Sequence, residues 1–202
     1  MMTTADLARV APLAADDPRS QDPKLEDLVN FVGYRPNALL TMARKPGVLP
    51  AVLGLVQTTL RGAGLLEPAL RFLVCAETCR GARCAYSSVH VVHAAHHAGV
   101  GWAQLDALPH HARGDRFSPR ERAALAIAAA GATLPVGDPS QAFEAAREHF
   151  SEDELLEIVS VVALFGWFNR WNSLMRTTLE DVPAEALEHV GWLRELMAEG
   201  RP

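Results

Sequence analysis

The sequence predicts an all-α protein, and three observations favour this fold class. Apolar residues recur at helical spacing along most of the 202-residue chain. Helix start signals recur as well, above all at Ser118 and Ser151, each followed three residues later by glutamate. No segment shows the alternation of β-branched and polar residues that is typical of strands. We therefore expect one helical bundle over residues 23–202, preceded by a flexible arm over residues 1–22.

The composition limits the classes of function. With 49% hydrophobic residues and a net charge of -5, the chain can form one sizeable core. No cluster of lysine and arginine is present, so nucleic-acid binding is not expected. No apolar run reaches the roughly 20 residues that a membrane span requires, and the first residues do not resemble a secretory signal. Three cysteines within ten residues are not a secreted disulfide framework, so we expect a cytoplasmic protein.

The first part of the domain is expected to hold three helices. One covers residues 23–31 and a second covers residues 36–43, with a proline near its start. A third begins at Pro46, carries apolar residues at helical spacing and ends at Gly62. These helices precede the part of the chain in which chemistry is most strongly indicated.

Residues 66–100 contain all three cysteines and four of the eight histidines. We expect a helix from residue 67 to about residue 80, broken by Gly81. A second helix opens at Cys84 and ends before Gly99, which suits a left-handed cap. Thiols and imidazoles at this density indicate that any chemistry lies here.

The last part of the chain is expected to form three more helices. A polar link with two histidines, His110 and His111, precedes the helix that starts at Ser118. The helix that follows Ser151 contains the apolar run LLEIVSVVALFGWFNRWNSLM. The final helix covers residues 183–197 and is amphipathic.

The run LRFLVCAETCRGARCAYSSVHVVHAAHHAGV resembles the carboxymuconolactone decarboxylase / alkylhydroperoxidase D-like superfamily. That superfamily carries a Leu-Arg-Glu helix, then Cys-x-Tyr-Cys-x-x-x-His and an alanine-rich helix. Residues 33–37 and 117–125 resemble its flanking segments, and residues 168–172 resemble its peroxidase-related branch. The resemblance covers roughly residues 30–185. It implies a homo-oligomer (dimer, trimer or hexamer) that acts on a small molecule without a cofactor and is reduced by a thiol protein.

This sequence departs from the family motif at three of its four functional positions. When Cys84 is aligned with the first family cysteine, Tyr86 matches the family tyrosine. Ser87 then stands in place of the second family cysteine, Val91 in place of the histidine and Phe72 in place of the glutamate. His90 lies one position before the missing histidine. The resemblance therefore implies that Phe72, Tyr86, Val91 and Asn169 border a substrate pocket, while the family's proton relay and dithiol are broken.

A relocated pair of thiols is our leading hypothesis. Cys75 and Cys79 share a helix face with Phe72, so they lie on the face that carries the family glutamate. Cys84, near a helix N-terminus that favours its thiolate, would attack a hydroperoxide or another small electrophile, and Cys79 would resolve the product. This predicts a peroxidase-like, antioxidant oxidoreductase. The alternative is that Cys75 and Cys79 are small buried hydrophobes.

Histidines provide a second source of chemistry. His90, His93 and His97 share one helix face and, with the cysteines, are ligands that zinc or copper would accept. We expect no metal, because ligands spread over two turns of one helix rarely converge on one ion. His90 is the candidate general base, or else a packed histidine.

Two other functions stay open from the sequence alone. In one, the protein is a cofactor-free lyase or isomerase that uses His90 on a small organic acid, and the cysteines are bystanders. In the other, it is a catalytically degenerate subunit that binds or assembles with a partner. Both follow from the broken family motif.

Overall fold

The computed structural model describes residues 8–199, and these residues form helices and no strand. The longer helices are α1 (Pro23–Val32), α3 (Val48–Val56), α4 (Pro68–Gly81), α5 (Ala85–His97), α7 (Pro119–Gly131), α9 (Glu152–Met175) and α11 (Gly191–Glu199). The shorter elements are η2 (Pro18–Ser20), α2 (Asn37–Met42), the π-helical turn η3 (Gln57–Arg61), α6 (Trp102–Asp106), η4 (Leu108–His110), α8 (Ser140–Ala146), η5 (Pro183–Glu185) and α10 (Ala186–His189). The predicted all-α fold is confirmed.

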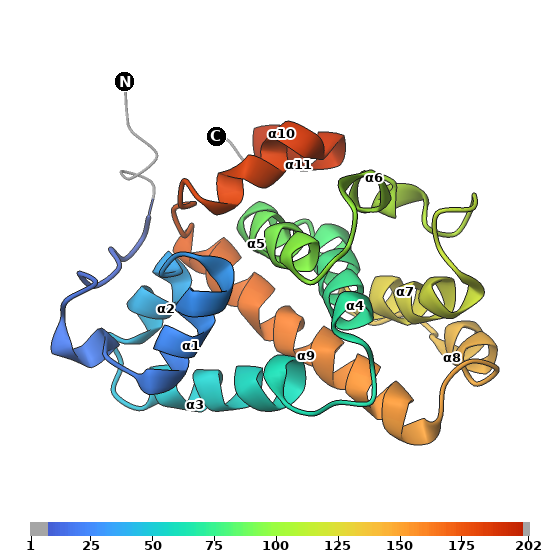
Figure 1. The fold of residues 1–202 in the computed structure, drawn as a ribbon, viewed down its shortest axis with the longest axis horizontal. Helices are drawn as coiled ribbons and strands as arrows, with labels where there is room; N and C mark the ends of the chain where they lie inside the picture. Colours follow the sequence, from blue (N-terminus) through green and yellow to red (C-terminus); the bar gives the residue numbers. More distant parts are fainter. Residues whose placement is uncertain (1–7, 200–202) are drawn as a thin grey trace.

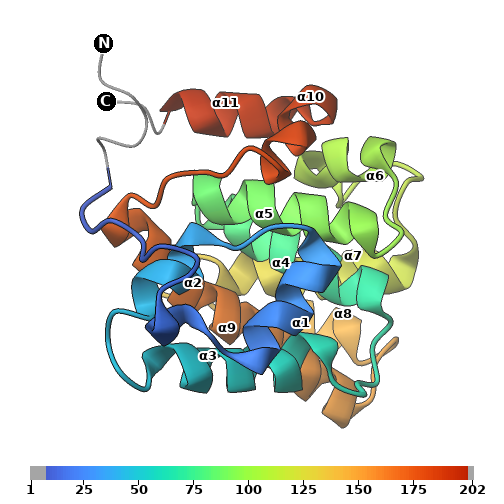
Figure 2. The same ribbon diagram turned by 60° about the vertical axis from the view of Figure 1, so that its left-hand side comes forward.

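Helix α4 lies at the centre of the core. It packs against α5, α7 and α9, and Figures 1 and 2 both show it enclosed by these three helices. Every residue from Leu70 to Cys79 is buried, including the charged Arg71 and Glu77. A helix that is buried on all sides shows little amphipathic pattern, which is what this sequence shows. The charges are compensated: Glu77 accepts two 2.7 Å hydrogen bonds from Arg80.

The helix ends follow the local signals in the sequence. The side chains of Ser118 and Ser151 each accept a hydrogen bond from a glutamate backbone N–H, and each glutamate carboxylate accepts one from the serine backbone N–H. Gly33 closes α1 in the left-handed conformation, with φ of 85°. These ends are correctly predicted because they depend on neighbouring residues only.

Three segments differ from the prediction, and one of them is α8, a helix that the sequence does not predict. The polar link after α5 contains α6 and η4, whose Leu105 and Leu108 are fully buried. The helix expected over residues 183–197 is instead three elements, because the backbone at Val190 is extended (φ −120°, ψ 111°) and its side chain enters the core. Core contacts made by these few side chains outweigh the amphipathic pattern.

The N-terminal arm expected over residues 1–22 is in contact with the bundle in its described part, residues 8–22. The backbone N–H of Arg9 donates to the carbonyl of Met175 at 2.9 Å, and Leu13 is buried in the core. The first seven residues lie outside the described part.

Among residues 8–199, no helix has both the length and the apolar composition needed to cross a membrane.

Candidate functional site

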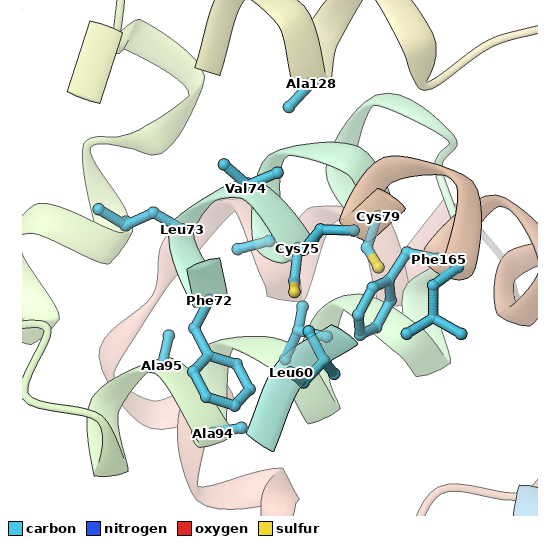
Figure 3. Packing of buried hydrophobic residues seen from close by; sticks show 14 of the residues in the cluster. Leu60, Phe72, Leu73, Val74, Cys75, Cys79, Ala94, Ala95, Ala128 and Phe165 are labelled. Carbon is cyan, nitrogen blue, oxygen red and sulfur yellow. The ribbon is translucent and has the colours of Figure 1, made fainter. Parts of the chain in front are cut away.

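An apolar cavity of about 120 Å³ lies between α1, η3, α4, α5 and α9. Its walls are mainly aromatic and aliphatic side chains, among them Phe31, Val56, Leu60, Phe72, Phe165 and Phe168. Figure 3 shows Leu60, Phe72 and Phe165 converging from three elements. A cavity of about 150 Å³ takes up benzene in another protein, so this one suits a small ring or a short branched chain.

Polar groups gather at one end of the cavity, around His90. Its Nδ1 lies 2.7 Å from the hydroxyl of Tyr34, and its Nε2 lies 2.7 Å from a carboxylate oxygen of Glu180. The other Glu180 oxygen accepts from the hydroxyl of Tyr86 at 2.9 Å and from the backbone N–H of Asn37. Two distant segments, those of Tyr34 and Glu180, therefore hold one imidazole in a fixed orientation.

The hydrogen-bond partners assign the tautomer of His90. An ionised Glu180 can only accept, so the His90 Nε2 carries a hydrogen and donates it. The His90 Nδ1 is then an acceptor, and the Tyr34 hydroxyl donates to it. Tyr34, His90 and Glu180 form a chain along which a proton can move between the cavity and a buried carboxylate.

Charge and burial determine the protonation states of the carboxylate and the two phenols around His90. Burial alone would raise the pKa of Glu180, but the hydrogen bond and electrostatic attraction of His90, with the backbone N–H of Asn37, outweigh burial and lower this pKa. Burial, followed by the charge of Glu180, raises the pKa of Tyr34 and of Tyr86. Both phenols therefore stay protonated and can donate hydrogen bonds.

Cys84 lies directly behind the cavity wall. Its thiol donates to the Ser87 hydroxyl at 3.2 Å, and Ser87 lines the cavity whereas Cys84 does not. The Ser87 hydroxyl also accepts from Asn172 Nδ2 at 3.0 Å, which fixes its position. Cys84 is the N-cap residue of α5, and its side chain makes no hydrogen bond to the backbone N–H groups of that helix.

The turn between α4 and α5 brings Cys79 next to Cys84. The Cys84 N–H donates to the Cys79 carbonyl at 3.2 Å and the Arg83 N–H donates to Arg80 at 3.0 Å, which is the hydrogen-bond pattern of a Schellman motif. The left-handed residue of this motif is Arg83, at φ 53°, where glycine is usual. Side chains at the first and last positions of the motif are commonly in contact.

The three cysteines are free and buried. Burial raises the pKa of Cys79 well above its usual value, and the neighbouring Cys84 and Cys75 raise it further. Burial likewise raises the pKa of Cys75. Cys75 and Cys79 point from α4 toward Phe165 in Figure 3. Cys79 is therefore a protonated thiol at neutral pH.

The structure brings most of the expected site residues to one cavity; those in its lining are Phe72, Tyr86, Ser87, His90 and Val91. Asn169, expected at the pocket, does not line it. The amide oxygen and nitrogen of Asn169 are buried without a well-formed hydrogen bond, and the Cys79 thiol is its polar neighbour. Asn172, one turn further along α9, lines the cavity instead. The two residues differ because position 169 lies on the side of α9 that faces α4, whereas position 172 lies on the side that faces the cavity.

Two residues of the site were not found from the sequence. Tyr34 lies in the turn after α1, inside a segment noted only for its family resemblance. Glu180 lies in the link after α9, where no periodicity or spacing marks it. Neither position has a local signal, because each matters only through its contact with His90.

The three-histidine face does not form a metal centre. Within residues 8–199, no group of three or more histidine, cysteine, aspartate or glutamate side chains is placed to hold an ion. His93 is buried, and its Nε2 lies 3.3 Å from the carbonyl of Val32. Burial lowers the pKa of His93.

Comparison with known proteins finds one family model and several solved structures that are similar to the chain. Residues 46–130 match the Carboxymuconolactone decarboxylase family. One similar crystal structure is that of the debrominase Bmp8, a cysteine-to-alanine variant in complex with 2,3,4-tribromopyrrole. It is 27% identical in sequence, has a TM-score of 0.82, and the match covers 89% of this chain and 96% of that one. The debrominase without ligand gives 28% identity and a TM-score of 0.81, over 90% and 97%.

A more distant structure supports the fold alone. It is an uncharacterized peroxidase-related protein from Ralstonia eutropha JMP134 with an alkylhydroperoxidase AhpD core, at 21% identity and a TM-score of 0.73, over 86% of this chain and 94% of that one. Among curated proteins, none matches the chain.

Proposed function

We propose that this chain is a member of the carboxymuconolactone decarboxylase / alkylhydroperoxidase D-like superfamily and a thiol-dependent oxidoreductase. Its substrate is a small, largely apolar electrophile that enters the aromatic cavity. Cys84 is the attacking thiol, Cys79 is the second thiol, and His90 with Tyr34 delivers the proton. A thiol-containing reductant then restores both cysteines.

One observation carries this proposal: the Schellman turn that joins Cys79 to Cys84 at the cavity wall. A disulfide needs Cα atoms about 4.4–6.8 Å apart. The 3.2 Å bond between the Cys84 N–H and the Cys79 carbonyl holds the two backbones close together. The turn thus supplies the second thiol that Ser87 cannot supply, and the cavity supplies a binding place within reach of the first.

The two thiols together provide two electrons. With a hydroperoxide, the Cys84 thiolate takes the outer oxygen and becomes a sulfenic acid, the O–O bond breaks, and the alcohol leaves with a proton from the Tyr34–His90 pair. The Cys79 thiol then attacks the Cys84 sulfur, water leaves, and a Cys79–Cys84 disulfide forms. With a halogenated ring, Cys84 takes the halogen, the ring carbon takes the proton, and Cys79 displaces halide to give the same disulfide.

The debrominase favours a halogenated ring as the substrate class. That protein binds a tribrominated pyrrole, and its ligand complex was obtained with a cysteine replaced. A polyhalogenated five- or six-membered ring is flat, apolar and electrophilic at halogen, which matches a cavity with four phenyl rings in its wall. Hydroperoxides of similar size stay as the second substrate class.

The test is bromide release from a tribrominated pyrrole, and alcohol formation from cumene hydroperoxide, each with dithiothreitol as reductant. We expect turnover by the native protein, loss of turnover in Cys84→Ala, and turnover within a few-fold of native in Cys75→Ala, a matched buried control. Turnover that survives Cys84→Ala would refute the thiol mechanism.

Acid–base chemistry at His90 is the second candidate, because Tyr34 and Glu180 hold its ring at 2.7 Å on both sides. In this case the protein is a lyase or isomerase of a small organic acid. Removal of the imidazole in His90→Gln then abolishes turnover, whereas Cys84→Ala leaves it intact. The same pair of variants therefore separates the two functions, and a protein that turns over neither these electrophiles nor a small organic acid would be a binding or assembly subunit.

A further inference from the structure

Arg61 lies in the wall of the apolar cavity. It is the last residue of the π-helical turn η3, and it also lines a polar hollow on the surface, together with Asp27, Asn30 and Gln57. Phe31 is the other residue that the cavity and the hollow share. Arg61 and Phe31 therefore lie at the boundary between the apolar interior and the polar surface.

The guanidinium of Arg61 is held in place without being neutralised. It lies over the Phe31 ring, with its carbon 4.7 Å from the ring centroid, and Phe31 stacks on Phe72 of the cavity wall at 5.9 Å. A guanidinium that lies over a ring keeps its N–H donors available at its edge. Among residues 8–199 no carboxylate forms an ion pair with Arg61; the exposed Asp27 lines the hollow only.

The turn that carries Arg61 is fixed to the core. The Gly62 N–H donates to the Gln57 carbonyl at 2.6 Å, five residues back, so this turn is wider than an α-helical one. The buried Arg71 donates from Nη1 to the carbonyls of Leu60 and Gly62, at 3.0 and 3.3 Å. Turns of this kind are frequent at functional sites, and this one brings the consecutive residues Leu60 and Arg61 to the same cavity.

The rest of the cavity leaves the positive charge of Arg61 uncompensated. In the described part of the chain, no aspartate or glutamate lines the cavity, and Glu180 is bonded to His90 and Tyr86 behind the wall. A ligand with a negative charge thus meets one fixed cation and no carboxylate. Because most of the wall is apolar, that charge is best placed at the boundary where Arg61 lies. One guanidinium matches one carboxylate, to which it can donate two parallel hydrogen bonds.

We propose that Arg61 determines specificity by selecting an anionic ring, which places its ring in the aromatic cavity and its carboxylate on the Arg61 guanidinium. That this ligand is a substrate rests on the proposed function, whose substrate class is narrowed here to rings that carry a carboxylate. A neutral ring still fits the cavity but lacks this contact. Arg61 binds the ligand, whereas Cys84, Cys79 and His90 carry out the reaction.

Calorimetric titration with benzoate and benzamide tests the proposal, because these two probes have nearly the same shape and differ in charge. The native protein should bind benzoate about tenfold more tightly than benzamide at low salt, and this preference should shrink as the ionic strength rises. Arg61→Gln should bind the two probes with affinities within about twofold of each other. Arg61→Lys keeps the charge but loses the planar fork, so it should keep a preference of about threefold.

Arg147→Gln is the matched control for the change of charge. Arg147 is exposed at the end of α8, has no ion-pair partner among residues 8–199 and does not line the cavity, so this variant should keep the native preference. Circular dichroism checks that the variants are folded.

The titration involves no thiol chemistry, so its outcome is separate from that of the turnover assays. A benzoate preference that depends on Arg61 in a protein without turnover would refute the proposed reaction alone. Equal affinities of the native protein for both probes, binding of neither probe, or a tenfold preference that survives in Arg61→Gln would overturn the role of Arg61.

Discussion

Replacement of Glu180 by glutamine changes the electrostatics of the site with little change of shape. One oxygen of Glu180 is bonded to His90 at 2.7 Å, and the other accepts from Tyr86 at 2.9 Å and from the Asn37 backbone. Glutamine keeps one oxygen for the second pair of donors. It presents an NH₂ group in place of the oxygen that faces His90, so two donors meet when Nε2 carries a hydrogen.

The expected loss of stability follows from these three hydrogen bonds. A bond to a charged group contributes about 1.5–3 kcal/mol and a neutral one about 0.5–1.5 kcal/mol, so the loss of charge weakens each by roughly 1 kcal/mol. The His90 and Glu180 side chains are only 13% and 12% exposed, so solvent screens little of this difference. Glu180→Gln should therefore lower the free energy of unfolding by about 2–3 kcal/mol at neutral pH, and turnover by at least tenfold if His90 delivers the proton.

The difference in stability between the native protein and Glu180→Gln should depend on pH in a direction that follows from the pKa of Glu180. The pKa of Glu180 is lowered in the folded protein, so its contribution to stability is present above the unfolded value of about 4.3 and is lost as the pH falls through the folded value. Urea denaturation should show the native protein and the variant converging as the pH falls below about 4. Equal stabilities at pH 7, or a constant difference down to pH 3, would refute the stabilising role of the ionised Glu180 carboxylate.

Two further substitutions test the packing around the site. Ser87→Ala removes the acceptor for the Cys84 thiol and for a buried amide, so it should lower the free energy of unfolding by about 1–3 kcal/mol in urea denaturation; no change would mean that water replaces the hydroxyl. Gly131→Ala would place a methyl group 2.7 Å from Val162 Cγ1, where α7 meets α9, and should cost about 1–3 kcal/mol. Gly137→Ala, with open space around its Cβ, is the control that should leave thermal stability unchanged.

The helices were largely predictable because their signals are local. The serine–glutamate boxes at residues 118 and 151 depend on four consecutive residues, and both occur in the structure. The helix α8 and the break at Val190 were missed, since each depends on a few side chains that enter a core formed by other elements. Arg83 was missed for a related reason: sequence rules assign the left-handed position to glycine, and Gly81 was expected to end α4 there.

The candidate site was predictable only where it lies on α4 and α5. Phe72, Ser87 and His90 meet because helical spacing fixes their faces once two adjacent helices pack together. Tyr34 and Glu180 lie 56 and 90 residues from His90 in the chain, and both are in links between helices. No periodicity connects such positions, so contacts of this kind emerge only when the whole fold is known.

Thiol counting with intact mass measurement tests the central claim, that Cys79 and Cys84 form a redox couple at the cavity wall. The native protein is treated with one equivalent of cumene hydroperoxide, and free thiols are counted after unfolding. We expect three thiols before treatment and one after it, a mass lower by two hydrogen atoms, and full recovery with dithiothreitol. Peptide mapping should leave Cys75 free. Three free thiols after treatment, or a disulfide that includes Cys75, would contradict the account.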